Sequence, residues 1–98
     1  MGSSLKSASF LIETRMVEAA LGDTDALYEL GLAYSSGTNG VEIDLILAHK
    51  WFNLAALSGD DRSQECRHDI SEEMTAREIA EAQRQARAWL QATTRQAA

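Results

Sequence analysis

Apolar residues recur with a helical period along most of the chain, and short polar segments separate five such stretches. In residues 5–21, one apolar face consists of Leu5, Ala8, Ile12, Met16, Ala19 and Ala20, and a second face consists of Phe10, Val17 and Leu21. Two apolar faces indicate a helix that touches two neighbours. We therefore expect the chain itself to cover the second face, which would otherwise mark a dimer or partner interface.

The two middle stretches predict helices that are enclosed on most sides. Residues 24–36 leave only a narrow polar edge, and Gly31 lies at their centre. Glycine inside a helix costs about 1 kcal/mol relative to alanine, so we expect a neighbouring helix to approach closely there. Asp44 is the expected N-cap of the next helix, which continues to about Ser58 and has Trp51 as its largest apolar anchor.

The last two stretches have the pattern of a terminal unit. Residues 60–73 carry only Cys66 and Ile70, with Met74 following, as a narrow apolar stripe, which is typical of a capping helix. Thr75 and Glu78 then have the spacing of a capping box and predict the start of the last helix. Its apolar side is formed by Ile79, Ala82, Ala86, Trp89 and Leu90.

A repeat period links these elements. The dipeptide at Gly22 and Asp23 recurs 37 residues later at Gly59 and Asp60. Self-similarity at this distance is typical of stacked helix pairs. We predict an all-α, solenoid-like α/α repeat of about five antiparallel helices in a single domain, residues 1–98. It divides into an N-terminal helix (5–21), one full repeat (22–58) and a degenerate capping repeat (59–98).

The central unit resembles the Sel1-like repeat, a relative of the tetratricopeptide repeat, as it occurs in small bacterial members. The matching positions are Ala26, Leu30, Gly31, Tyr34, Gly37, Gly40, Asp44, Ala48, Trp51, Ala55 and Gly59. Beyond residue 60 the match fades, with His68 in place of a glycine and Ser71 in place of a tyrosine. The resemblance implies an adaptor that binds another protein and has no catalytic activity.

Charge and cysteine content restrict the expected partners and cellular compartment of the protein. A net charge of −6 disfavours binding to nucleic-acid phosphates, which requires a basic surface. The single cysteine, Cys66, excludes an intramolecular disulfide and favours a reducing compartment. The apolar run from Phe10 to Ile12 is far too short for a signal peptide or a membrane span. We therefore expect a cytoplasmic protein that binds neither nucleic acid nor membrane.

Residues with catalytic or metal-binding potential do not form a recognisable motif. Cys66, His68 and Asp69 lack metal-ligand spacing, and His49 is expected on the border of a polar helix face, in contact with solvent. We predict no catalytic residue, metal or cofactor. A self-assembling structural repeat protein remains the alternative, and a hydrolase built on a repeat scaffold is less favoured.

Two surfaces are candidates for partner binding. Ile46, Lys50, Asn53 and Leu57 fall on one strip of their helix, and this strip places two large apolar residues beside a lysine. Arg77 and Arg84 could dock an acidic partner, although Glu73 and Glu81 are spaced to pair with them. A homodimer through an uncovered helix face also stays open.

Overall fold

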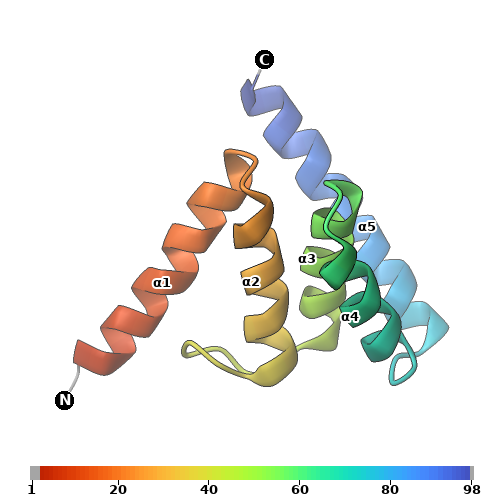
Figure 1. The fold of residues 1–98 in the computed structure, drawn as a ribbon, viewed down its shortest axis with the longest axis horizontal. Helices are drawn as coiled ribbons and strands as arrows, with labels where there is room; N and C mark the ends of the chain where they lie inside the picture. Colours follow the sequence, from red (N-terminus) through yellow and green to blue (C-terminus); the bar gives the residue numbers. More distant parts are fainter. Residues whose placement is uncertain (1–2, 98) are drawn as a thin grey trace.

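The chain folds into five helices, and no strand occurs between residues 3 and 97. The computed structural model describes the backbone of residues 3–97 and the side chains of residues 10–94. The helices are α1 (Ser3–Ala20), α2 (Thr24–Ser36), α3 (Leu45–Leu57), α4 (Asp61–Ser71) and α5 (Ala76–Ala97). Successive helices alternate in direction (Figure 1). The all-α helical-repeat prediction is confirmed.

Helices α2 and α3 form the central pair on which the others pack. α1 lies against α2, whereas α4 and α5 both lie against α3 (Figure 1). The shortest dimension of the molecule is 22 Å. Because a helix with its side chains is about 10–12 Å across, the molecule is two helices thick.

The two Gly-Asp turns have the same geometry. Gly22 and Gly59 adopt φ angles of 96° and 98°, a left-handed conformation that glycine reaches without a Cβ clash. The next residue in each turn, Asp23 or Asp60, donates its backbone N–H to a carbonyl five residues earlier, at 3.0 and 3.1 Å. Each aspartate also caps the following helix through its side chain. The repeat period is therefore a repeated turn in space.

Side-chain caps also fix the starts of α3 and α5. The carboxylate of Asp44 accepts a hydrogen bond from the backbone N–H of Leu47 at 3.0 Å. Thr75 and Glu78 form the expected capping box: the Thr75 hydroxyl accepts from the Glu78 N–H at 3.1 Å, and the Glu78 carboxylate accepts from the Thr75 N–H at 2.8 Å.

Two apolar clusters meet at the central pair. The larger cluster joins α1, α2, α3 and α5, and its members include Ile12, Ala19, Leu27, Leu30, Trp51, Leu54 and Ala86. The smaller cluster contains Ala48, Phe52 and Ile70, with Cys66 and Met74 packed against it. The expected stripe on α4 therefore packs against α3. The exposed positions of this helix, Asp61, Arg62, Gln64, Glu65, His68 and Asp69, are all polar.

The expectation about the second face of α1 is wrong. Ile12 and Ala19 are buried and Met16 packs beside them, but Phe10, Val17 and Leu21 are 66%, 62% and 84% exposed. Among the described residues α1 packs mainly along α2, and this leaves the three side chains, the last of them one residue beyond the end of α1, largely uncovered. Leu5 and Ala8 lie outside the residues whose side chains are described.

Gly31 marks the closest approach between α2 and α3. A Cβ atom at this position would lie 2.5 Å from Cδ1 and Cε1 of Phe52, far inside van der Waals contact. Phe52 is 1% exposed, so its ring has little room to move away. The absence of a side chain at Gly31 is thus what lets the ring lie on the backbone of α2.

We predict that Gly31→Ala destabilises the protein even though alanine is the better helix former. Overpacking a core costs about 1–3 kcal/mol, whereas the gain in helix propensity is at most about 1 kcal/mol. The free energy of unfolding, measured in guanidinium chloride, should fall. Ser36→Ala, at an exposed position of the same helix, is the control and should change it by less than about 0.5 kcal/mol. An unchanged or higher stability of Gly31→Ala would contradict the prediction.

Candidate protein-interaction surfaces

The strip on α3 is partly occupied by contacts within the chain. Nζ of Lys50 lies 4.5 Å from the ring centroid of Trp51 and 5.5 Å from that of Trp89, and the two rings meet edge to face with their centroids 4.8 Å apart. Lysine over an aromatic face is stabilised by the ring quadrupole. Burial also lowers the pKa of Lys50. Lys50 therefore seals the contact between α3 and α5.

The other strip residues differ in how far they reach solvent. The side-chain oxygen of Asn53 accepts a hydrogen bond of 2.5 Å from the guanidinium of Arg67 on α4. Ile46 is half-buried, and Leu57 is 65% exposed. What remains free for a partner is thus the apolar end of the strip at Leu57, together with the accessible part of Ile46.

The two arginines lie on α5 and differ in their partners. Arg84 makes two hydrogen bonds to the carboxylate of Glu81, at 2.6 and 2.9 Å, and these bonds lower the pKa of Glu81 to about 2. Arg77 is exposed, and the expected ion pair with Glu73 does not form between these two described residues. Arg77 is accordingly the more available of the two cations.

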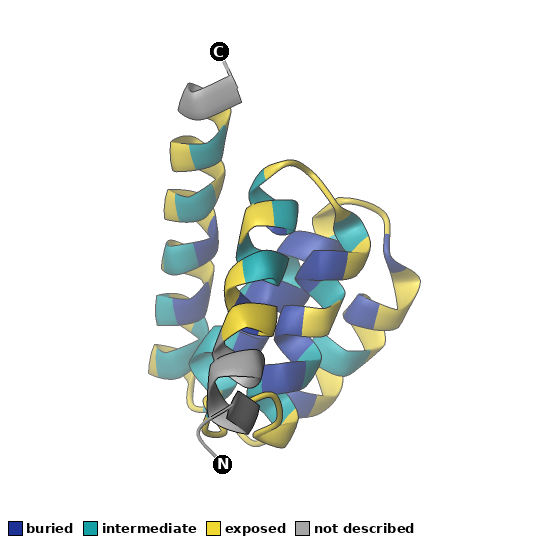
Figure 2. Ribbon diagram, turned by 90° about the vertical axis from the view of Figure 1, so that its left-hand side faces the viewer, coloured by how far each residue is buried: buried dark blue, intermediate teal, exposed yellow. Residues whose placement is uncertain are grey.

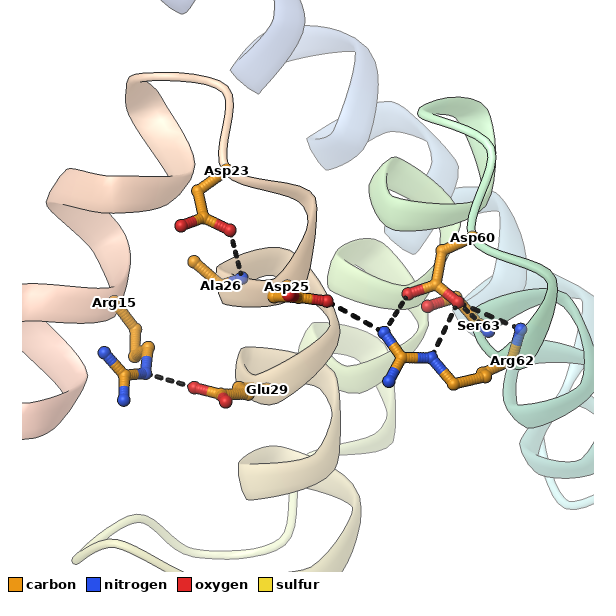
Figure 3. A network of polar contacts seen from close by, with 8 residues as sticks. All are labelled: Arg15, Asp23, Asp25, Ala26, Glu29, Asp60, Arg62 and Ser63. Atoms are coloured by element: carbon orange, nitrogen blue, oxygen red, sulfur yellow. Dashed lines mark hydrogen bonds and ion pairs between the residues drawn. The ribbon is translucent and has the colours of Figure 1, made fainter.

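A polar network ties the N-terminal ends of α2 and α4 together (Figure 3). The guanidinium of Arg62 donates to Asp60 at 2.8 Å and to Asp25 at 3.0 Å, and it stacks on the ring of Tyr28 at 4.0 Å. The hydrogen bonds from Arg62 lower the pKa of Asp60, which is the N-cap of α4. Asp25 and Arg62 are 37 residues apart, so equivalent positions of successive units carry opposite charges that pair.

A second network joins α1 to α2. The guanidinium of Arg15 donates to Glu18, on the same helix, at 2.6 Å. It also pairs with Glu29 across the helix interface (Figure 3). The two carboxylates raise the pKa of Arg15. This network lies at the surface, where solvent screens ion pairs and leaves each one a small contribution to stability. Its main effect is to fix how α1 sits on α2.

His49 is buried, and the expectation of a solvated histidine is wrong. It is 3% exposed, and its Nδ1 has no hydrogen-bond partner in the part of the chain that the structure describes. Burial, followed by the positive charge of Arg67, lowers its pKa, so the imidazole is neutral at neutral pH. The helical projection placed His49 correctly on its helix, but it could not show that α4 covers this border.

The other candidate reactive residues lie on α4 and differ in burial. Cys66 is half-buried, and burial raises the pKa of its thiol, which keeps it protonated. His68 is exposed and lies 3.6 Å from Glu72. Within the described residues, no cluster of three or more histidine, cysteine, aspartate or glutamate side chains is arranged to hold a metal ion. No helix in the described range is both long and apolar enough to cross a bilayer.

The fold defined by these helices is an α/α repeat of the kind that presents surfaces to other proteins. Comparison with family models places a Sel1 repeat at residues 24–60 of the chain, which covers α2, the loop, α3 and the second Gly-Asp turn. Residues 24–60 are thus similar to a Sel1 repeat, and repeats of this family generally mediate protein–protein interaction. No curated protein and no solved structure matches the chain.

The signature positions of this repeat build its framework. Ala26, Leu30, Gly31, Ala48, Trp51 and Ala55 are buried, and Tyr34 is half-buried against both apolar clusters. Gly37 ends α2 in a left-handed conformation, Asp44 caps α3, and Gly59 forms the second turn. Gly40 also has a positive φ angle, of 82°. The signature residues within the helices are thus buried or half-buried, whereas those of the turns and the cap are exposed.

We predict that His49 makes stability depend on pH in mildly acidic solution. A histidine in the unfolded chain has a pKa of about 6.5, and the pKa of His49 in the folded protein is lower. At pH values between these two pKa values, the imidazole takes up a proton in the unfolded state but not in the folded state. Stability should therefore fall as the pH drops through about 6.5, and this loss ends below the folded pKa. Unfolding in denaturant at several pH values between 7.5 and 5 measures the slope.

The matched variants are His49→Gln and His68→Gln, one buried and one exposed. His49→Gln should reduce the slope between pH 7 and 5, whatever its effect on absolute stability, whereas His68→Gln should retain it. The same slope in His49→Gln and in the wild type would show that the buried imidazole is not its source.

Proposed function

We propose that the protein is a small cytoplasmic adaptor that binds another protein and acts without catalysis or a cofactor. The observation that carries this proposal is the Sel1 repeat at residues 24–60, because this repeat is a protein-interaction module. Large exposed apolar side chains on an otherwise polar surface support the proposal. Single exposed apolar residues are common on protein surfaces, whereas a group of them at one place is typical of a binding site.

The strip on α3 is the proposed contact surface within this function. Leu57 and the accessible part of Ile46 supply apolar contacts, while Lys50 and Asn53 are held in place by α5 and α4. A partner would thus meet a preorganised surface, which reduces the entropy lost on binding. Arg77 and Arg84 form a second proposed contact, for an acidic partner. Arg84 would first have to release Glu81.

Self-assembly is the alternative function, and the two ends of the molecule restrict its form. Open head-to-tail stacking needs complementary faces at both ends. The exposed positions of α4 are polar, and Leu90, 42% exposed, is the one large apolar residue exposed on the described part of α5. A closed dimer through α1 is one geometry that needs no apolar face on α4. A dependence of mass on concentration in sedimentation would support this alternative.

We predict that the double variant Ile46→Asp/Leu57→Asp loses its protein partner. A carboxylate on each apolar position would be desolvated against the partner, which is expected to weaken binding by about tenfold or more. The partner is first identified by affinity capture from a lysate of the source organism with the wild-type chain as bait, and its binding is then measured with purified proteins.

The matched control is Ile43→Asp. Ile43 is 63% exposed, close to the value of Leu57, and it lies in the loop before α3 rather than on the strip. The control should retain binding, and all variants should keep the wild-type helical circular dichroism signal. Full binding by the double variant would exclude the strip and direct attention to Arg77 and Arg84 or to α1.

A further inference from the structure

The outer face of α1 is an uncovered apolar stripe. Phe10, Val17 and Leu21 are each more than 60% exposed, and with Thr14 they follow the alternating three- and four-residue spacing of a helix seam. Figure 2 views the molecule from the α1 side and shows exposed segments along this helix. The spacing is that of a surface that another helix packs against.

Aligning α1 with α3 by the repeat period shows which contact the face of α1 lacks. The 37-residue period aligns Phe10 with Leu47 and Val17 with Leu54 on α3. Both α3 residues belong to the core cluster that the apolar side of α2 completes. The same register on α1 has no described helix against it. α1 thus presents to solvent the seam that, on α3, is covered by a helix.

Charged residues beside the stripe indicate the chemistry of the occupant. Helical spacing places Glu13 on one flank of the stripe and Glu18 on the other. Arg15 is the sole basic residue between positions 10 and 21. Its guanidinium pairs with Glu18 on α1 itself and with Glu29 on α2, the second contact being drawn in Figure 3. Glu13 is exposed and makes no ion pair within the described residues, whereas Glu18 is half-buried and shares Arg15 with Glu29, so the flanks of the seam are acidic on balance, in a chain whose net charge is −6.

These charges disfavour a second copy of the chain as the occupant. A dimer through α1 would place Glu13 and Glu18 near the same residues of the other copy, and like charges at the flanks of a helix pair are destabilising. Lysine or arginine in the partner's flanking positions would instead complement both glutamates, as charges beside a coiled-coil seam do when they select partners.

We propose that the outer face of α1 docks an amphipathic helix of a partner protein, with apolar residues along its seam and lysine or arginine on its flanks. This inference rests on the proposed function and names the face and the class of partner. The incoming helix takes the place on α1 that α2 takes on α3. The adaptor thereby gains a binding surface that is separate from the strip at Leu57.

The experiment uses two synthetic peptides as probes and the full chain as receptor. Both peptides are fluorescently labelled 18-residue helices with leucines at alternating three- and four-residue spacing. One carries lysine on both flanks, and its twin carries glutamate. Fluorescence anisotropy should show that the lysine peptide binds at least about tenfold more tightly than its twin, and that added salt weakens its binding.

Matched variants locate the binding face. Val17 is 62% exposed and Leu57 is 65% exposed, and both lie in helices, so Val17→Gln and Leu57→Gln remove similar apolar surface from α1 and from the strip. Val17→Gln should weaken binding of the lysine peptide by about tenfold, and Leu57→Gln should leave it unchanged. Glu13→Gln/Glu18→Gln should reduce its affinity and flatten its salt dependence. Leu21→Ser provides a second test of the face at a position that is 84% exposed.

Several outcomes would overturn the inference. The first is equal binding of the two peptides, and the second is binding of the lysine peptide that neither Val17→Gln nor Leu21→Ser weakens. The third is a mass that depends on concentration in the wild type but not in Val17→Gln, which would identify a second copy as the occupant. Failure of this inference differs from failure of the proposed function. A natural partner that binds Val17→Gln as tightly as the wild type would leave the adaptor intact and remove only the role of α1.

Discussion

The contact between Gly31 and Phe52 is the constraint on which the rest of the molecule depends. Because α2 has no Cβ atom at this point, the Phe52 ring lies directly on its backbone, and the two helices approach closely. Small residues on α3, Ala48 and Ala55, are fully buried in the same interface. Once α2 and α3 are locked in this way, α3 can turn Trp51 toward α5 and still present Ala48 and Phe52 to α4.

The helices after residue 60 do not repeat the packing of α2 on α3. The repeat period aligns Gly31 with His68, a large polar residue that faces solvent. Without a glycine there, α4 lacks the surface on which a following helix could pack as closely as α3 packs on α2. Accordingly, α5 packs on α3 instead, where Trp89 meets Trp51 and Lys50 closes the contact. The Gly-Asp turn and the Asp60 cap persist because they depend only on local sequence.

Structural features that depend on residues close in sequence were predictable. Features that depend on contacts between residues far apart in sequence were less predictable. Capping at Asp44 and at Thr75 involves residues three positions apart, so the pattern of residue types was sufficient. The burial of His49 and the stacking of Lys50 on two tryptophans depend on how α4 and α5 sit on α3, which helical periodicity does not encode. The sequence pattern identified the second face of α1 as apolar. Whether this face is covered depends on how the later helices pack, which the pattern does not encode. The sequence also predicted a close helix approach at Gly31, but it did not identify Phe52 as the residue in contact.

The two ends of the helix array differ chemically, and this difference bears on how the protein associates. At one end α4 exposes polar residues only, so another repeat would gain little apolar burial by stacking there. At the other end, α1 exposes Phe10, Val17 and Leu21, whose burial would be favourable by roughly 25 cal/mol for each Å² removed from water. Stacking identical copies end to end would set the apolar face of α1 against the polar face of α4, and open growth of this kind needs two complementary faces. Contact through α1 alone would therefore join this face to one other surface and would not by itself propagate through the polar face of α4.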